Sequence, residues 1–383
     1  MLGKRRGRML VAGASLLSVS VSLVSCGNSG GGDAPSSGPV YFGVSAPLSG
    51  DKAEYGTYWK QGFQLALDEI NGKGGIGGRP VKLRWEDSQS DPKQSGPIAT
   101  KFVDDSKIVA ELGDFSSSAS MAASPIYQRG GMVQYGFTNS NPDFTKGGDL
   151  MWSPCETQDF LQEKNVEIIK KYVKKVAVVY QDTDWGKSAY DAFTKWAGQA
   201  GIQVTYKSSF LPTSTDFRPV LLKARDSEPE ALVHLGYAPD GALIAKQIRA
   251  VGFKGRFFGG QNTQQFLDLA GPDAEGDILP GDFLPGDPDP LVQAFVTKFH
   301  SKYHALPNAF NVMAYDALTD LAFVAEKGGA TRAGIKKGLE MGLKLPSVYF
   351  KGSFSFDDQR RPSGITTTEI IVKSGKFVPN TGS

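Results

Sequence analysis

The feature that most constrains this chain is a regular alternation of short apolar runs with longer amphipathic stretches, which begins at Val40. Short runs rich in branched residues predict strands, and apolar residues at helical spacing predict helices. Repeated strand–helix alternation predicts parallel sheets with helices on both faces. The expected strands cover 40–44, 81–85, 108–112, 132–134, 176–180, 202–206, 231–235 and 256–258, and the expected helices cover 56–71, 92–103, 117–129, 158–173, 186–200, 217–226 and 239–251.

The alternation restarts near residue 156, which predicts an α/β protein with two lobes, each a doubly wound parallel sheet. In such sheets a ligand lies beyond the carboxyl ends of the strands and against helix N-termini, so the cleft between the lobes is the expected site. We expect lobe 1 to comprise 39–155 and 283–349, and lobe 2 to comprise 156–282 and 350–379. Three crossings, near 153–157, 282–284 and 349–352, would form the hinge. Beyond residue 282 we expect helices at 290–304, 309–327 and 331–341, and a hairpin of strands near 353–356 and 366–372.

The N-terminus is typical of a processing segment. A basic stretch, Lys4–Arg8, precedes the 16 apolar and small residues Met9–Val24, which suit a signal sequence better than a membrane span of about 20 strongly apolar residues. The tetrapeptide ending at Cys26 resembles the bacterial lipobox, so we expect 1–25 to be a lipoprotein signal peptide and Cys26 to carry lipid. Residues 26–38 are a Gly/Ser/Pro linker, the composition that a flexible tether needs. The alternative is an ordinary secretory signal with an incidental cysteine.

Composition excludes several classes of protein. Outside residues 1–25 the chain has 38 basic and 40 acidic residues, so it lacks the basic surface that nucleic acid requires. Cys26 and Cys155 are the only cysteines, which argues against a disulfide framework and a cysteine zinc site. The glycines of 72–77 match a dinucleotide motif but follow a helix and precede a strand, which is the reverse of the required order. With three histidines and no catalytic spacing, we expect no enzyme, no metal and no cofactor.

An ordered set of short motifs runs from about Val40 to about Val378. They are Pro47-Leu48-Ser49-Gly50, Ala53-Glu54-Tyr55-Gly56, Glu69-Ile70-Asn71, Asp91-Pro92-Lys93-Gln94, Ser117-Ser118, Asn141-Pro142-Asp143, Thr215-Asp216-Phe217 and Ala274-Glu275-Gly276. In order and spacing they resemble the leucine/isoleucine/valine-binding proteins, which have the type I periplasmic solute-binding fold. This resemblance implies an ABC importer component on the outer side of the bacterial membrane, in the periplasm or at the cell surface. Its partners would be a permease and ATPases, and the lipid would be its only attachment to the membrane. The two lobes would close over the ligand by a hinge motion.

The same resemblance assigns a carboxylate site to the start of the helix expected at 117. Ser117, the backbone of Gly136 and Thr138 would hold the ligand carboxylate, with Ser118 beside them. Free N–H groups and the helix dipole favour an anion at such a terminus. The residues alone permit a plainer alternative, because serine is a favoured N-cap.

The resemblance also assigns the rest of the pocket. Tyr55, Trp185 and Tyr237 align with pocket aromatics of the family, whereas Gln261 aligns with a position where amino-acid binders carry an acid. A neutral side chain binds an ammonium group less strongly than a carboxylate does. The ligand is therefore either an amino acid, branched-chain by family preference, or an amine-free aromatic or aliphatic carboxylate or amide.

Ser90 and Ser116 stand where the best-known family members have a disulfide. This difference from the family concerns stability and not the choice of ligand.

The use of the fold stays open. Because one fold serves several uses, a ligand sensor that feeds a signalling partner is an alternative to a transport receptor.

Overall fold

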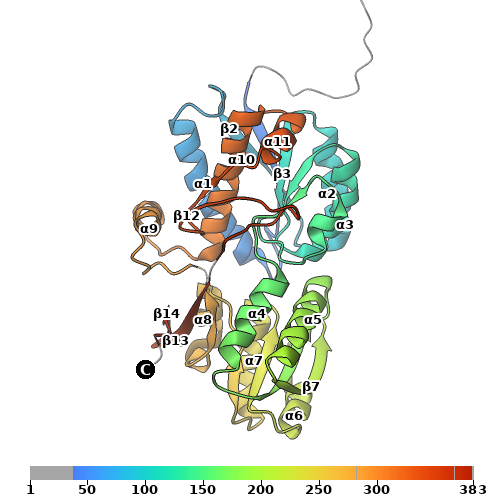
Figure 1. Ribbon diagram of the computed structural model, residues 1–383, viewed down its shortest axis with the longest axis vertical. Coiled ribbons are helices and arrows are strands. Elements are labelled where there is room, and N and C mark those ends of the chain that lie inside the picture. The colour runs from blue at the N-terminus through green and yellow to red at the C-terminus, as the bar shows by residue number, and fades with distance from the viewer. Residues whose placement is uncertain (1–37, 282, 366, 382–383) are drawn as a thin grey trace, which may run out of the picture. The chain divides into compact units, whose positions relative to one another are not determined.

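The computed structural model describes residues 38–281, 283–365 and 367–381. Its first sheet is parallel throughout, with the strand order β2-β1-β3-β4-β5. The strands are β1 Val40–Ala46, β2 Val81–Asp87, β3 Ile108–Gly113, β4 Val133–Tyr135 and β5 Met151–Trp152. Around this sheet lie α1 Ala53–Gly72, α2 Pro92–Asp104, α3 Ser117–Arg129, α9 Pro290–Tyr303, α10 Ala309–Gly328 and α11 Arg332–Leu339 (Figure 1).

Local sequence explains where these helices begin and how closely they pack. Asp91 caps α2 by accepting a hydrogen bond from the backbone N–H of Lys93, and a proline occupies the first helical position, as the sequence predicts. Helix α1 packs on α10 at Gly62, where a Cβ atom would lie 2.1 Å from the carbonyl oxygen of Asn311. The glycine therefore permits the two helix backbones to approach each other closely.

The second sheet is also parallel, with the order β7-β6-β8-β9. Alternate residues of its central strand face opposite sides: Val176 and Val178 pack under α4 and α5, whereas Ala177 and Val179 pack under α6 and α7. Helices thus cover both faces, which confirms the predicted doubly wound α/β fold (Figure 1). The elements are β6 Lys175–Gln181, β7 Gln203–Phe210, β8 Ala231–Leu235, β9 Arg256–Phe258, α4 Gln158–Ile169, α5 Asp184–Gln199, α6 Arg218–Asp226, α7 Ala238–Ala250 and α8 Gln264–Ala270.

The predicted hairpin between 353–356 and 366–372 is wrong. Strand β12 (Gly352–Phe354) pairs with β11 (Leu345–Ser347), and β13 (Thr368–Lys373) pairs with β10 (Ile278–Gly281) and β14 (Lys376–Pro379). The two segments were expected to pair with each other because they are close in sequence, but β12 and β13 belong to different sheets. The reason lies in side-chain burial: Ile278 and Ile371 enter the core of the second sheet, which draws β10 and β13 there.

The chain passes three times between the two sheets: between β5 and α4, between β10 and α9, and between β12 and β13. Before the third passage, Arg360 donates hydrogen bonds to the carbonyl oxygens of Met151 and Gly148, each at 3.0 Å. The division of the chain into lobes stays a prediction. From these contacts we propose that the third crossing follows Pro362, later than the boundary at 349/350 expected from the sequence.

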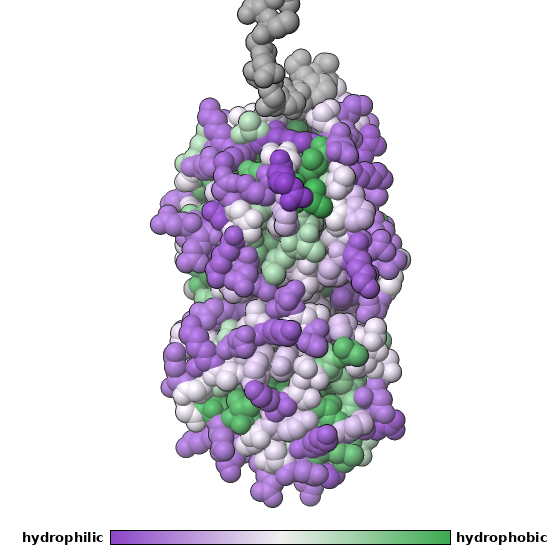
Figure 2. Space-filling model, turned by 90° about the vertical axis from the view of Figure 1, so that its right-hand side faces the viewer, coloured by the Kyte–Doolittle hydropathy of each residue, from purple (hydrophilic) through white to green (hydrophobic). Residues whose placement is uncertain are grey.

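The predicted signal peptide (1–25), Cys26 and nearly all of the predicted linker lie outside the described residues. Within the described residues, no helix combines the length and apolar character needed to cross a membrane. On the face of the molecule seen in Figure 2, hydrophilic side chains predominate and hydrophobic ones lie in separate patches.

Candidate ligand-binding site

A cavity of about 240 Å³ lies where the carboxyl ends of the two sheets face each other. Phe115 follows β3, Gly236 follows β8 and Gly259 follows β9, and all three line it. The site therefore lies where open parallel sheets bind ligands. Its volume is that of a small molecule.

Stacked aromatic rings form one wall of the cavity. Trp185, in the first turn of α5, stacks on Tyr237 with ring centroids 4.8 Å apart and an interplanar angle of 18°. Behind them the ring of Tyr55, which is fully buried, stacks on Phe115 at 4.1 Å. Of the three predicted aromatics, Trp185 and Tyr237 line the cavity, and Tyr55 supports the wall from behind. Such a wall favours a ligand with an apolar or aromatic body.

Tyr55 also connects the two sheets. Its hydroxyl donates a hydrogen bond to Oε1 of Gln261 and accepts one of 3.3 Å from the backbone N–H of Ala238. The Gln261 amide in turn donates to the carbonyl oxygen of Gly236 at 3.4 Å. Gln261 does line the cavity, but its acceptor oxygen is already bonded within the protein.

The start of α3 has the character of an anion site. Its N-cap, Ser116, makes no side-chain capping hydrogen bond. The alternative explanation, that serine is present here to cap the helix, is therefore not supported. The hydroxyl of Ser118, whose side chain is 8% exposed, has no hydrogen-bond partner among the described residues. Ser117 is also buried, and its hydroxyl accepts a hydrogen bond of 3.3 Å from the backbone of Asn141. Neither Ser117 nor Ser118 is among the residues that line the cavity, but Phe115, two residues before the helix, does line it. Uncapped N–H groups and a polar side chain without a partner suit a carboxylate at this terminus.

Gly136 is not brought to the cavity. Its N–H donates to the carbonyl oxygen of Trp152 at 2.9 Å, and its carbonyl accepts from the Ser153 hydroxyl at 2.8 Å. Both backbone groups are therefore already used inside the protein. Thr138 does line the cavity, and its hydroxyl donates to the carbonyl of Phe115 at 3.2 Å.

Ser140 is a cavity residue that the sequence analysis missed. Its hydroxyl oxygen accepts two hydrogen bonds, from Nε1 of Trp185 at 2.9 Å and from Nε2 of Gln158 at 2.7 Å. Among the described residues its own hydroxyl proton has no acceptor. Because two donors occupy the oxygen, that proton is available to an acceptor atom in the cavity.

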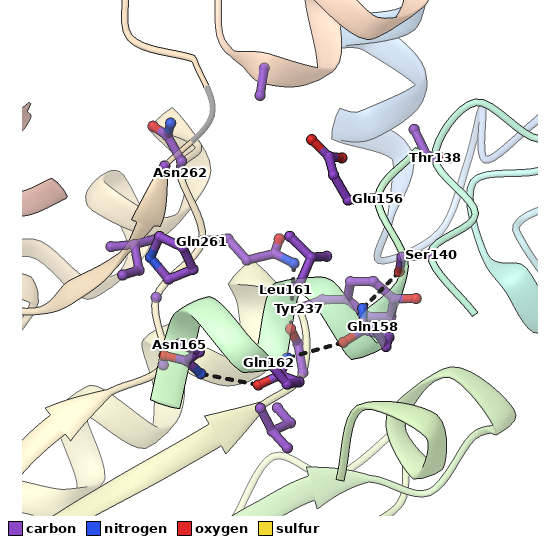
Figure 3. A pocket seen from close by; sticks show the side chains of 18 of the residues that line it. Thr138, Ser140, Glu156, Gln158, Leu161, Gln162, Asn165, Tyr237, Gln261 and Asn262 are labelled. Atoms are coloured by element: carbon purple, nitrogen blue, oxygen red, sulfur yellow. Dashed lines mark hydrogen bonds between the residues drawn. The ribbon is translucent and has the colours of Figure 1, made fainter. Parts of the chain in front are cut away.

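A ladder of amides on α4 continues from Ser140. Asn165 donates to Gln162 at 3.1 Å, Gln162 donates to Gln158 at 3.0 Å, and Gln158 reaches Ser140 (Figure 3). These residues are spaced four and three apart, so they share one helix face. That face looks into the cavity instead of into solvent, and Gln158 is only 2% exposed. The sequence signal that could have identified this face of α4 is the helical spacing of its three uncharged amide residues.

Glu156 was also missed. It lies in the first crossing between β5 and α4, is 3% exposed, and lines the cavity. In Figure 3 its carboxylate points into the cavity, away from the amide ladder. A single acidic residue carries no spacing signal, so the sequence alone did not distinguish it from other acids.

A buried polar cluster lies beneath the loop that carries Gln261. Imidazole Nδ1 of His234 lies 2.8 Å from the carbonyl oxygen of Gly259, and Nε2 lies 2.8 Å from Asp240 Oδ2. The backbone N–H groups of Gly259 and Gly260 donate to the carboxylate of Asp277. Burial raises the pKa of Asp277 to about 7, although these hydrogen bonds and His234 oppose the rise. The cluster therefore fixes the loop in place.

Arg361 supports the other side of the site. Its buried guanidinium donates to the carbonyl oxygens of Asn139, Asn141 and Cys155. Burial lowers its pKa to about 10. The segment that it holds carries Thr138 and Ser140. Among the described residues no group of three or more His, Cys, Asp or Glu side chains could hold a metal ion.

Comparison with known proteins gives the family. A sequence profile described as periplasmic binding protein matches residues 39–375. Leu/Ile/Val-binding protein homolog 2 of Brucella abortus (strain 2308) is 28% identical over 335 residues, which cover 85% of this chain and 88% of that protein. The chain thus belongs to the periplasmic binding protein family, which confirms the resemblance seen in the sequence.

Solved structures agree on the fold. The substrate-binding protein LivJ of a branched-chain amino acid transporter from Streptococcus pneumoniae, in complex with isoleucine, is 25% identical with a TM-score of 0.81, covering 88% of this chain and 97% of that one. A solute-binding protein of an ABC transporter from R. palustris, in complex with benzoate, is 19% identical with a TM-score of 0.81, covering 89% and 95%. The fold is that of the type I members. Membership implies a small-molecule ligand, permease and ATPase partners, and an extracytoplasmic location.

Proposed function

We propose that this chain is the solute receptor of an ABC importer and that it binds a small carboxylate-bearing ligand, an amino acid by preference, without converting it. One observation carries the proposal: a cavity walled by two stacked aromatic rings is also lined by Phe115, which lies two residues before a helix N-terminus that has no side-chain cap and carries an unpartnered serine hydroxyl. The helix terminus suits a carboxylate, and the rings suit an apolar or aromatic side chain.

The carboxylate end of the ligand would contact the start of α3, Thr138 and the hydroxyl proton of Ser140. This differs from the assignment made by resemblance in one residue, because Ser140 replaces Gly136. Ligand on one half would then draw the halves together by hinge closure, with Trp185 and Tyr237 contributed by the second half. The ligand would thereby be enclosed between the two sheets.

An amine-free aromatic or aliphatic carboxylate, or an amide, is the second candidate. Gln261 is neutral and its acceptor oxygen is bonded to Tyr55, so this position offers no charge to an ammonium group. The related structures hold isoleucine in one case and benzoate in another, so the fold alone does not choose between the two classes.

We also propose a lipid anchor at Cys26, supported by the lipobox resemblance and the Gly/Ser/Pro linker that follows it. Mass spectrometry of the chain purified from membranes would find a lipid-modified N-terminal cysteine, and Cys26→Ala would release the protein from the membrane fraction. An unmodified Cys26 in membrane-extracted protein would contradict the anchor.

Isothermal titration of the purified protein with amino acids and with matched carboxylates, benzoate included, tests the ligand class. Ser118→Ala breaks no hydrogen bond within the described chain, so a loss of affinity of about tenfold would report a contact with the ligand. Ser301→Ala, on the exposed part of α9, is the control and should leave affinity unchanged. If no carboxylate binds, or if Ser118→Ala binds as well as the unaltered chain, the proposal is wrong; mass spectra that show a chemically altered ligand would indicate an enzyme instead.

A further inference from the structure

The amide ladder on α4, formed by Gln158, Gln162 and Asn165, gives the cavity a polar wall. All three residues line the cavity, and Gln158 and Gln162 are only 2% and 8% exposed. The amides are not what holds the helix on its sheet, because Val166 and Ile169 of α4 enter the core of the second sheet. Polar groups buried away from water are unfavourable unless they are hydrogen-bonded, so the partners of these amides decide what they do.

The hydrogen bonds of the ladder leave donors free on the side chains that line the cavity. Each amide nitrogen carries two hydrogens and donates one of them: Asn165 to Gln162, Gln162 to Gln158, and Gln158 to Ser140. The second hydrogen of each amide has no acceptor among the described residues, and neither does Oδ1 of Asn165 have a donor there. The ladder therefore offers a ligand one N–H donor from each amide and an acceptor at its far end.

These free groups favour an uncharged polar group over an apolar one. An apolar group placed against the ladder would displace water from the N–H donors and return no hydrogen bond. The oxygen of a hydroxyl or carboxamide accepts from these donors, and the nitrogen of a carboxamide can also donate to Oδ1 of Asn165. Within the described part of the chain no Lys or Arg lines the cavity, so a second carboxylate would find no cation there.

The ladder also sets where on the ligand this polar group would be. It starts at Ser140, where we expect the carboxylate, and follows α4 away from it (Figure 3). Gln162 lies four residues beyond Gln158, which is about 6 Å along the helix axis. A group bonded to Gln162 or Asn165 is therefore several covalent bonds away from the carboxylate.

We propose that the amide ladder of α4 binds an uncharged polar group, a carboxamide or a hydroxyl, at the end of the ligand remote from its carboxylate. The receptor thereby selects a polar far end over a branched aliphatic one of the same shape. The inference rests on the proposed function, which places the carboxylate at α3 and Ser140. It makes Gln162 and Asn165 specificity-determining residues, and it holds whether or not the ligand has an amine.

Probe pairs of equal shape test the inference: L-asparagine with L-leucine, L-glutamine with L-homoleucine, and 4-hydroxybenzoate with 4-methylbenzoate. Dissociation constants are measured by isothermal titration on the full chain in detergent. In at least one pair the unaltered protein should bind the polar member about tenfold or more tighter than the apolar member. Gln162→Met keeps the length of the side chain but removes the amide, and should weaken binding of the polar member about tenfold while leaving the apolar member unchanged or better bound.

Two further variants separate selectivity from folding. Asn165→Leu keeps the shape of the side chain at the partly exposed end of the ladder and should shift the preference in the same direction as Gln162→Met. Gln264→Met is the control, because Gln264 is exposed, bonds to Asp268 one turn along α8 and does not line the cavity. It should change neither affinity.

The outcomes distinguish this inference from the proposed function. If the unaltered protein prefers the apolar members, or if Gln162→Met and Asn165→Leu weaken both members of a pair equally, the ladder only supports the structure and the inference is wrong, although the carboxylate receptor stands. The same holds if none of these probes binds but another carboxylate does. If no carboxylate binds at all, the proposed function fails and this inference fails with it.

Discussion

Trp185 donates the hydrogen of its indole Nε1 to the hydroxyl oxygen of Ser140 across 2.9 Å. The bond joins the first turn of α5, beside the second sheet, to the loop that follows β4 of the first sheet. Since Ser140 also accepts from Gln158, a single oxygen connects the aromatic wall, the amide ladder and the expected carboxylate site. Substitutions at this point should therefore affect ligand binding more than folding.

Trp185→Phe should weaken ligand binding about fivefold to tenfold. The variant keeps most of the aromatic stack on Tyr237 but loses a hydrogen bond of about 1 kcal/mol that holds the two sheets together. Titration with the tightest ligand of the screen measures the effect. Trp196→Phe is the control, because Nε1 of Trp196 bonds to Asp159 away from the cavity; equal losses in both variants would refute the role assigned to Trp185.

Arg361→Met should lower both stability and ligand affinity. It leaves the buried carbonyl oxygens of Asn139, Asn141 and Cys155 without this donor, at a cost of about 2–4 kcal/mol in the free energy of unfolding. Thermal and denaturant unfolding measure the stability. Arg225→Met removes an exposed arginine that also bonds to a carbonyl, at Val251, and should cost less than about 1 kcal/mol. A loss as large in the control would mean that burial of Arg361 is unimportant.

Gly62→Ala should destabilise the fold by about 1–3 kcal/mol, because its Cβ would meet the backbone of α10 at Asn311. Gly72→Ala lies in the same helix with no atom within 4 Å of the added carbon, so it should stabilise by about 0.5–1 kcal/mol. Urea unfolding of both variants gives the comparison. A neutral Gly62→Ala would show that α1 and α10 are packed less closely than the structure has them.

Asp277 should make stability depend on pH. Burial raises its pKa from 3.8 to about 7, so the folded state holds a proton that the unfolded state releases. By linkage, its contribution to the free energy of unfolding is largest below about pH 4 and falls as the pH rises to about 7. Asp277→Asn should flatten the unfolding free energy over this range, whereas Asp268→Asn, exposed on α8, should leave the slope unchanged. An unaltered slope in Asp277→Asn would assign the pH dependence to other groups.

The fold could be predicted from the sequence wherever local pattern and burial agree. Helix α3 begins at Ser117 and ends at Arg129 as predicted, since a buried strand and a serine turn precede it and Gly130 follows it. Strand β10 was missed because it contains Pro280 and Gly281, which disfavour strands, and only its pairing with β13 maintains it. Pairing between distant segments is a tertiary property, so the hairpin error has the same origin.

The site was predicted less completely than the fold. Thr138, Trp185, Tyr237 and Gln261 were expected to face the cavity and do line it, whereas the cavity position of Ser140 and the inward face of α4 depend on how the two sheets meet. Glutamine on a helix ordinarily faces solvent, and no local pattern reverses that expectation for Gln158. The Gly136 assignment could not be tested by local pattern either, because both of its backbone groups are bonded to residues of the β5 strand and the segment after it.

Ser90 and Ser116 converge on one oxygen, Asp114 Oδ1, at 2.5 Å from the Ser90 hydroxyl and 3.2 Å from the Ser116 backbone nitrogen. A carboxylate thus joins the two segments that a covalent bridge joins in the best-known relatives. Folding of the described part of the chain therefore requires neither an oxidising compartment nor a disulfide isomerase. The protein should fold correctly when it is expressed in the bacterial cytosol, and thiol reagents in the buffer should leave its stability and ligand affinity unchanged.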